Sequence, residues 1–367
     1  MNNEEYWYWI CNIENVWNST IRKLLEIFKS PKELYECSES ELSRYINSSS
    51  FKNHYELIRN IVKSRNECLI NECYNKLYKR EIYFISIDNE KYPDRLRGID
   101  NYPYGIYVKG NISALSKKTV AIVGARNCTT YGKKIAKDIG FELAANGVNV
   151  ISGLARGIDS AGLWGAVDAN GVAGAVLGCG VDICYPRENI ELYEVIKENG
   201  FILSDYPIGT KPLAWQFPLR NRIISGLADI VLVVEARERS GSLITVEYAL
   251  EQGKDVCAVP GRVGDGLSSG CNRLIKEGAA MVLSANDVLH ELGINNDSNT
   301  KFFRKNDIVL EKEIETLYSY VDFIPKNIQQ LMNETGMSSS EILRGLIKLQ
   351  MMNYIEEPSK NYYSRKI

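Results

Sequence analysis

Arginine residues stand at turns where buried strands are expected to give way to helices. Arg126 follows the apolar run TVAIVG, and Arg220 and Arg222 crowd the expected first turn of a helix after Phe217. The N-terminus of a helix carries a partial positive charge, so a cation there is unfavourable unless it shares an anion. The spacing therefore favours phosphate binding. Two alternatives stay open: a structural salt bridge for Arg126, and a packed Phe217 beside solvated arginines.

Four such turns contain small or hydroxyl-bearing residues that suit anion binding. Backbone N–H groups at a helix N-terminus bind anions, arginine forks hold phosphates, and an aromatic ring stacks on a base. Together these groups suit a single strand of nucleic acid. The residues predicted to bind it are Gly124, Arg126, Thr129, Ser152, Gly153, Phe217, Arg220, Asn221, Arg222, Ser240, Gly241 and Ser242. Asp159 follows the second turn and is expected to act as a helix cap.

Other kinds of site find little support in the sequence. The first turn lacks the G-x-G-x-x-G pattern of dinucleotide-binding folds, and no Walker lysine follows it. Two histidines are too few for most histidine-based triads and histidine-rich metal sites. None of the nine cysteines forms a C-x-x-C pair, so we expect reduced thiols used as small apolar residues. The sequence predicts no catalytic residue, no metal and no cofactor.

The turns need a scaffold that brings them to one place. Before Lys118, the segment YPDRLRGIDNYPYGIYVKG predicts an extended, proline-punctuated connector. From Lys118 onward, short apolar strands alternate with glycine-rich turns and helices over roughly 180 residues, which predicts an α/β fold with a Rossmann-like, doubly wound parallel sheet. Ligands bind such a sheet at the carboxyl ends of its strands, near the point where the strand order reverses. The four turns follow strands, so we expect them to meet at this edge.

Composition divides the chain into four parts. Residues 1–80 predict a small helical domain that resembles SAM or helix-hairpin-helix domains, and residues 81–295 predict the Rossmann-like DNA-binding domain. A polar, asparagine-rich linker is expected at 296–308. Residues 309–367 predict a winged helix of three helices and a terminal two-stranded ribbon. From Lys301 on, ten basic and nine acidic residues nearly cancel, so this part fits a protein-contact module as well as a DNA-binding one.

The 367-residue chain as a whole is almost neutral. It has 44 basic and 46 acidic residues and a formal charge of −2, so any binding of nucleic acid must come from a local patch. The N-terminal sequence opens with acidic residues and lacks the pattern of a signal peptide. No apolar run approaches the roughly 18–20 residues that a membrane span needs. We expect a cytoplasmic protein without a membrane partner.

Seven motifs follow one another along the chain: AIVGARNCTTYG, SGLARGIDSAG, LGCGVDICYPREN, FPLRNRIISGL, SGSLIT, VPG and GCNRLIKEGA. Their order and spacing resemble the DNA-processing protein A (DprA, or Smf) family over nearly the whole chain. The resemblance implies a homodimer, joined through its Rossmann-like domain, that binds and protects single-stranded DNA without catalysis. It also implies that the protein helps to load the RecA recombinase during natural transformation. The family's DNA-contacting positions match Arg126, Ser152, Gly153, Phe217, Arg220, Asn221 and Arg222.

The chain departs from the family pattern in one place. The family usually carries Ala-His where this sequence has Gly162 and Leu163. A pH-sensitive or catalytic role for that histidine is therefore excluded here. Because the position falls on a helix beyond the turn, we expect DNA binding to survive.

Two other functions remain as alternatives to a DNA-binding recombination mediator. Related Rossmann-like enzymes act on nucleoside phosphates and use a P-G-G-x-G-T-x-x-E loop. The corresponding turn here runs from Ser240 to Glu247, and Leu243 and Ile244 remove the close backbone approach and the hydroxyl that a ribose phosphate needs. The other alternative, a purely structural adaptor, leaves the crowded arginines unexplained.

Overall fold

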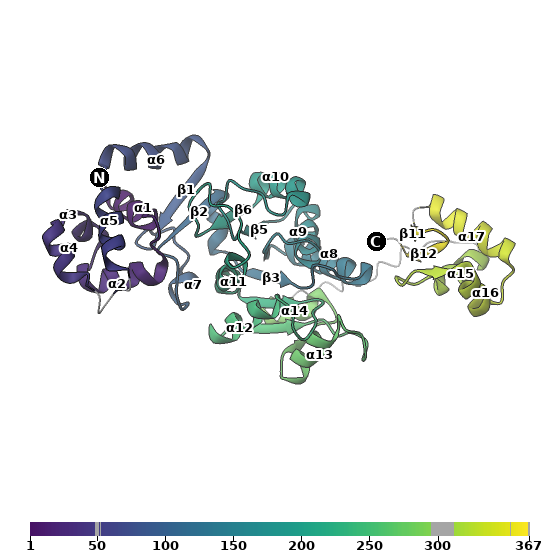
Figure 1. Ribbon diagram of the computed structural model, residues 1–367. Coiled ribbons are helices and arrows are strands. Elements are labelled where there is room, and N and C mark those ends of the chain that lie inside the picture. Colours follow the sequence, from purple (N-terminus) through teal and green to yellow (C-terminus); the bar gives the residue numbers. More distant parts are fainter. Residues whose placement is uncertain (48–50, 52, 295–311, 353, 366–367) are drawn as a thin grey trace. The chain divides into compact units, whose positions relative to one another are not determined.

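The structure, a computed structural model, describes residues 1–47, 51, 53–294, 312–352 and 354–365 (Figure 1). It forms two compact units. The larger unit contains Met1–Asn127 and Ala136–Ile294, and the smaller one contains Cys128–Ile135 and Asn295–Ile367. The linker predicted at 296–308 lies outside the described residues.

In the N-terminal part of the larger unit, the described residues form six helices. Local caps set where they begin: the Asn2 side chain accepts a hydrogen bond from the Glu5 N–H at 3.0 Å, and the Glu5 carboxylate accepts one from the Asn2 N–H at 2.7 Å. Ser38 and Glu41 form the same capping box. The helices agree with the helical pattern predicted for this region, and their standing as a separate domain stays a prediction. They are α1 (Asn3–Cys11), α2 (Asn18–Phe28), α3 (Pro31–Glu36), α4 (Glu39–Tyr45), α5 (His54–Ser64) and α6 (Glu67–Lys79).

A nine-stranded sheet forms the centre of the larger unit, in the order β1-β2-β6-β5-β4-β3-β7-β8-β9. Its central strands are buried along their whole length, as expected of a parallel sheet that helices cover on both faces. The strands are β1 (Ile82–Ser86), β2 (Gly105–Gly110), β3 (Thr119–Val123), β4 (Asn149–Ser152), β5 (Ala173–Val176), β6 (Phe201–Ser204), β7 (Ile230–Val233), β8 (Asp255–Ala258) and β9 (Ala280–Met281).

The strand order reverses between β3 and β7. From β3 the chain adds β4, β5 and β6 on one side, and it then returns to add β7, β8 and β9 on the other. All pairings from β6 through β3 to β9 are parallel. The predicted doubly wound, Rossmann-like sheet is therefore confirmed, and its switch point lies at the carboxyl ends of β3 and β7.

One edge of the sheet differs from the prediction. The segment YPDRLRGIDNYPYGIYVKG reads as an extended connector, but its last six residues form β2, which pairs antiparallel with both β1 and β6. Asn111 continues this contact by donating from its backbone N–H to the Gly200 carbonyl oxygen at 2.7 Å. The sheet thus begins with an antiparallel hairpin, β1–β2, before the parallel part.

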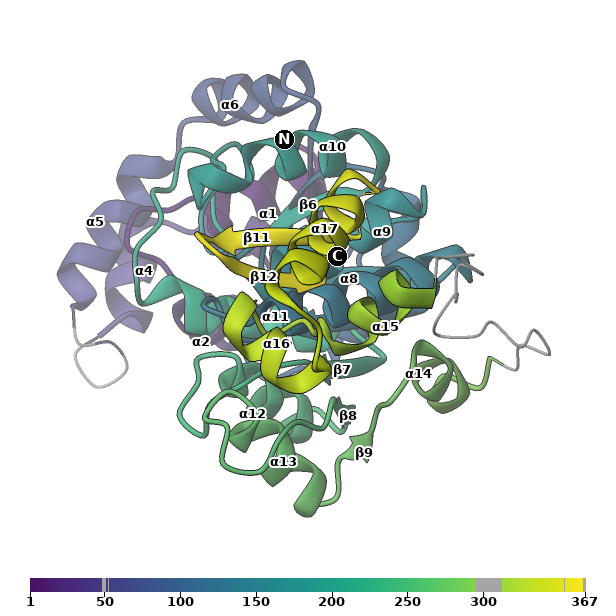
Figure 2. The ribbon, with the colours of Figure 1, turned by 90° about the vertical axis from the view of Figure 1, so that its right-hand side faces the viewer.

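Helices cover the sheet. Figure 1 and Figure 2 both show α10 toward the β6 end of the sheet and α12 and α13 toward the β8 end. The helices of this region are α7 (Asp94–Arg97), α8 (Thr130–Ala145), α9 (Ile158–Asp168), α10 (Ile190–Asn199), α11 (Gln216–Leu227), α12 (Leu243–Glu251), α13 (Ser269–Lys276) and α14 (Ala285–Glu291), with short 3-10 helices at Ile112–Ser116 and Arg187–Asn189. None of the helices within the described residues is both long and apolar enough to cross a membrane.

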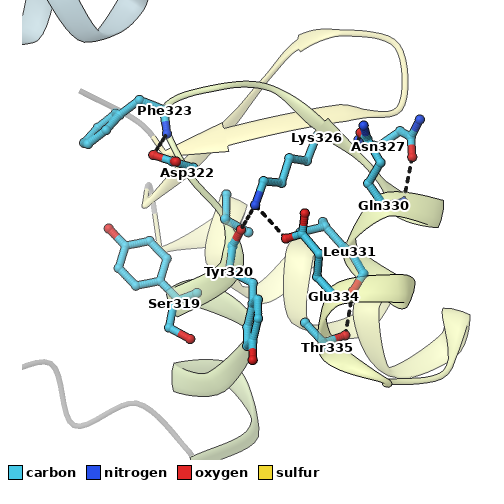
Figure 3. Close-up of polar contacts among 12 residues, drawn as sticks. Ser319, Tyr320, Asp322, Phe323, Lys326, Asn327, Gln330, Leu331, Glu334 and Thr335 are labelled. Carbon is cyan, nitrogen blue, oxygen red and sulfur yellow. Dashed lines mark hydrogen bonds and ion pairs between the residues drawn. The ribbon is translucent and has the colours of Figure 1, made fainter. Parts of the chain in front are cut away.

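The smaller unit has its own core and a three-stranded antiparallel sheet in the order β10-β12-β11. Three helices followed by a β-hairpin agree with the order predicted for residues 309–367. Figure 3 shows Lys326 holding two helices together: its Nζ donates to the Tyr320 carbonyl oxygen at 2.9 Å and pairs with Glu334 at 2.6 Å. The elements are α15 (Lys312–Tyr320), β10 (Lys326–Asn327), α16 (Ile328–Thr335), α17 (Ser339–Met351), β11 (Ile355–Ser359) and β12 (Tyr362–Arg365).

Candidate functional site

Three turns are tied together at the switch point of the sheet. The Ala125 N–H donates to the Glu235 carbonyl oxygen at 2.7 Å, and the Ile158 N–H donates to the Ala125 carbonyl oxygen at 3.2 Å. These bonds join the turns that follow β3, β4 and β7. A β-carbon at Gly124 would lie 2.7 Å from Ile158 Cγ1, so the close approach of the turns requires glycine there.

Gly157, in the turn after β4, is also required for the close approach of the turns. Its φ is +79°, and a β-carbon would lie 2.5 Å from the Arg126 carbonyl oxygen. Both the backbone conformation and the space therefore require glycine. As a result, the peptide that carries Arg126 has a fixed position.

Arg126 is exposed and forms no ion pair among the residues that the structure describes. Its positive charge is one of the influences that lower the pKa of Arg220, which is buried at the same edge of the sheet. Two cations that repel each other favour an anion between or beside them. Arg126 is thus available to a phosphate, as the sequence predicts, and the structural salt bridge does not form within the described residues.

Arg220 is only 5% exposed and contacts backbone carbonyl groups. Its Nη1 donates to the carbonyl oxygen of Gly153 at 3.0 Å and to that of Val176, which joins the ends of β4 and β5. Burial lowers the pKa of Arg220 to about 10, against the opposing effect of Asp159, so the side chain stays charged at neutral pH. The structure therefore gives Arg220 a structural role at this edge, and its phosphate contact stays a prediction.

Gly153 and Asp159 complete this buried group. The Gly153 N–H donates to Asp159 Oδ2 at 3.1 Å, and a β-carbon at Gly153 would lie 2.5 Å from Arg220 Nη2. Burial raises the pKa of Asp159, while the charge of Arg220 opposes this rise. Asp159 is thus more than the helix cap that the sequence suggests, because it also accepts from the Gly153 N–H and its charge raises the pKa of Arg220.

Ser152 has its hydroxyl group inside the protein. The residue is fully buried, and its Oγ donates to the Ile122 carbonyl oxygen at 2.6 Å. A hydroxyl has one proton to donate, so this bond uses the donor that the sequence assigns to a phosphate. The bond links β4 to β3 and helps to hold the carboxyl edge in register.

A pair of aromatic rings lies beside the arginines. Phe217 and Tyr185 stack with their centroids 5.2 Å apart and their planes 22° from parallel, and Tyr185 is about half exposed. A β-carbon at Gly178 would lie 2.9 Å from Phe217 Cδ1, so glycine lets the ring settle against the loop after β5. Tyr185 is not among the residues predicted from the sequence. This aromatic residue belongs to the motif CYPREN, near the sheet edge where a ligand is predicted, and could have been included for that reason.

The structure separates Arg222 from Arg220. Two residues along an α-helix correspond to about 200° of rotation, and Arg222 accordingly faces away and pairs with Asp205 at 2.7 Å. Asn221 stays with Arg220 and accepts a hydrogen bond from its Nε at 3.2 Å. The predicted cluster of two arginine forks is therefore divided between the two faces of α11.

The fourth turn opens α12. Ser240 Oγ and Ser242 Oγ lie 2.8 Å apart, and the Ser242 N–H donates to Ser240 Oγ at 3.4 Å. Gly241 lies in open space. Thr129 belongs to the smaller unit, where its Oγ1 accepts a hydrogen bond from the Gly132 N–H at 2.9 Å in the first turn of α8.

Comparison with known proteins agrees with this arrangement. Residues 83–293 match the model of the DNA recombination-mediator protein A family. DNA processing protein DprA of Streptococcus pneumoniae is 45% identical over 206 residues, which cover 56% of this chain and 73% of that protein.

Two solved structures are similar to this chain. The structure of DNA processing protein A from Streptococcus pneumoniae has a TM-score of 0.68 at 36% identity and covers 79% of this chain and 98% of that one. A structure of DNA processing protein A from Helicobacter pylori is described as showing its single-stranded DNA binding mode. It has a TM-score of 0.52 at 28% identity, and the match covers 57% of this chain and 95% of that one. The sheet, its switch-point turns and these matches together show that the chain belongs to the DNA recombination-mediator protein A family.

Proposed function

We propose that this protein binds single-stranded DNA at the carboxyl edge of β3, β4 and β5. Arg126 holds a phosphate, and the stacked rings of Phe217 and Tyr185 accept a base. The observation that carries this proposal is Arg126, an exposed cation without an ion pair among the described residues, fixed at the switch point on the same edge of the sheet as Arg220. The single-stranded DNA binding described for the Helicobacter pylori relative supports it.

The chemistry of the edge favours a single strand over a duplex. Stacking on an aromatic ring needs an unpaired base, and every base has a face that stacks. Contacts to phosphates position a strand but carry no sequence information. We therefore expect little sequence preference, and strong dependence on salt because phosphate binding releases counterions.

The wider role that we propose is that of a recombination mediator. The protein protects incoming single-stranded DNA, helps to load RecA during natural transformation, and acts as a homodimer. Membership in the DNA recombination-mediator protein A family supports this role. A strand-exchange assay tests the RecA step. When RecA and a single-strand-binding protein are present, addition of this protein should accelerate strand exchange by RecA.

We also propose that the protein acts without turnover. The alternative is an enzyme that acts on nucleoside phosphates at the turn before α12. Leu243 is buried at the start of that helix, and Ile244 follows it where such enzymes have small or hydroxyl-bearing residues. Incubation with nucleoside monophosphates should release no base, and release of a base would favour the enzyme.

Fluorescence anisotropy with a labelled oligonucleotide tests DNA binding. The full-length protein should bind a single strand more tightly than a duplex of equal length, and the affinity should fall steeply as salt is added. Equal affinity for both, or affinity that does not respond to salt, would contradict the proposal.

A further inference from the structure

The larger unit contains a cavity of about 550 Å³ on the other face of α11. It lies between the loop that joins α1 to α2 and the start of α11, and its volume is within the range of roughly 300–1,000 Å³ of small-molecule sites. Leu219 and Arg222 of α11 line it together with Trp215, the N-cap residue of that helix, at the spacing that places side chains on one helix face. Among the residues predicted to bind DNA, only Arg222 lines this cavity.

Tryptophan rings form the outer part of the cavity. Trp17 and Trp215 meet edge to face, with centroids 5.5 Å apart and planes at 87°. They are 50% and 46% exposed, and the ring of Tyr206 lies 6.4 Å from Trp215. An edge-to-face pair leaves ring faces uncovered, and two half-exposed tryptophans at a cavity are suited to stack on a flat ligand.

The inner part of the cavity has a buried ion pair with unused hydrogen-bonding atoms. Arg222 Nη2 contacts Asp205 Oδ2 at 2.7 Å, and the two side chains are 6% and 9% exposed. Nε and Nη1 of Arg222 and Oδ1 of Asp205 are buried and have no hydrogen-bond partner among the described residues. Buried polar groups in native proteins are nearly always paired, so two donors and an acceptor without partners point to a ligand.

The charges of the lining restrict what this ligand is. Glu14 and Asp205 carry negative charge, and Arg222 carries the one positive charge among the residues that line the cavity. Without an excess of cations, the interior disfavours phosphate and other anions. A neutral, flat, heteroaromatic group that offers both acceptors and a donor along its edge fits these conditions.

We propose that this cavity binds a purine base. The base stacks on Trp17 or Trp215, its ring nitrogen or carbonyl oxygen accepts from Arg222, and its exocyclic amine or ring N–H donates to Asp205 Oδ1. A purine offers a larger stacking face than a pyrimidine. The sugar and any phosphate stay at the open mouth, away from the buried carboxylate of Asp205. This site is separate from the proposed phosphate contacts of Arg126.

Isothermal titration of the full-length protein with guanosine, adenosine, cytidine and thymidine tests the proposal. The purine nucleosides should bind more tightly than the pyrimidines. Trp17→Ala should weaken purine binding by roughly 5-fold to more than 100-fold, the range for loss of one stacked base. Asp205→Asn, which keeps the shape of the side chain, should also weaken it at least several-fold. Tyr55→Ala, at an exposed ring outside the cavity, serves as the matched control and should bind like the unmodified protein.

Competition then identifies the source of the base. Displacement of bound guanosine by oligo(dA) but not by oligo(dT) would assign the cavity to a purine within a strand, and the absence of displacement would assign it to a free nucleoside. Arg126→Ala should leave nucleoside binding intact, so failure of this proposal is distinguishable from failure of strand binding. No purine binding, binding unchanged in Trp17→Ala, or pyrimidines bound as tightly as purines would overturn the proposal.

Discussion

Burial gives Arg126 and Arg220 different roles at the same edge of the sheet. Arg126 is exposed and has no ion pair among the described residues, whereas Arg220 is buried and donates to backbone carbonyl groups. The sequence predicts a phosphate contact for both, because both residues stand near a helix start. Their difference depends on Gly153 and Val176, which approach Arg220 only in the folded sheet.

Alanine variants should separate these two roles. Arg126→Ala should weaken single-strand binding by about 1–3 kcal/mol, the range for a charge-assisted bond, and make the salt slope shallower by about 0.7. Its free energy of unfolding should not change, because the side chain is exposed. Arg22→Ala, which removes an exposed cation from α2, is the matched control for binding and should behave like the unmodified protein.

Arg220→Ala should instead lower the free energy of unfolding, measured by urea titration. Removing Arg220 leaves the buried Gly153 and Val176 carbonyl groups without this donor, and a buried polar group that loses its partner typically costs about 1–3 kcal/mol. An unchanged urea midpoint would contradict the structural role assigned to Arg220.

The buried carboxyl group of Asp159 should make stability depend on pH. Burial raises the pKa of Asp159, so the folded chain binds this proton more tightly than the unfolded chain. The group therefore adds stability as the pH falls through its folded pKa toward 3.8, the ordinary value for the unfolded chain. Relative to Asp159→Asn, the unmodified protein should gain free energy of unfolding as the pH falls through the raised pKa of Asp159 toward 3.8. A relative loss over this range would show that the pKa is lowered instead.

At the scale of elements, the sequence predicts the doubly wound sheet because its buried parallel strands are continuous apolar runs bounded by glycine. The sequence prediction is wrong for Gly105–Gly110, which forms the antiparallel strand β2. This strand follows a proline-containing segment and is not a continuous apolar run, so nothing in its sequence indicates a buried strand. The predicted site groups Arg220 and Arg222 together, although residues two apart on a helix face apart. Their partners come from distant segments. Asp205 and the Gly153 carbonyl become neighbours of α11 only through tertiary packing.

The ring pair held by α11 and the loop after β5 should contribute to strand binding. Phe217→Ala and Tyr185→Ala should each weaken binding of an oligo(dT) strand by about 1–3 kcal/mol, the range for one stacked base. The salt slope should stay the same, because no phosphate contact is lost. Tyr55→Ala removes an exposed ring elsewhere and should bind normally. Unchanged affinity in both ring variants would place the rings outside the strand's path.

At the scale of the whole molecule, binding has to come from a local surface, because the chain carries a formal charge of −2. A short edge that holds a few nucleotides covers a long strand only when several copies bind side by side. We therefore expect at least a dimer. Light scattering at micromolar concentration should return a mass of at least twice the 41.5 kDa of one chain. A monomer, both with and without DNA, would contradict the homodimer.

The central claim is that a single strand lies along the carboxyl edge of β3, β4 and β5. Photochemical cross-linking tests this claim most directly. A strand of deoxythymidine with single 5-bromodeoxyuridine substitutions, irradiated in complex with the full-length protein and mapped by mass spectrometry, reports which side chains touch a base. The proposed site predicts cross-links at Tyr185 and Phe217, and their yield should fall when Arg126→Ala weakens binding at moderate salt. Cross-links confined to the smaller unit or to the helices α1–α6, with none at this edge, would contradict it.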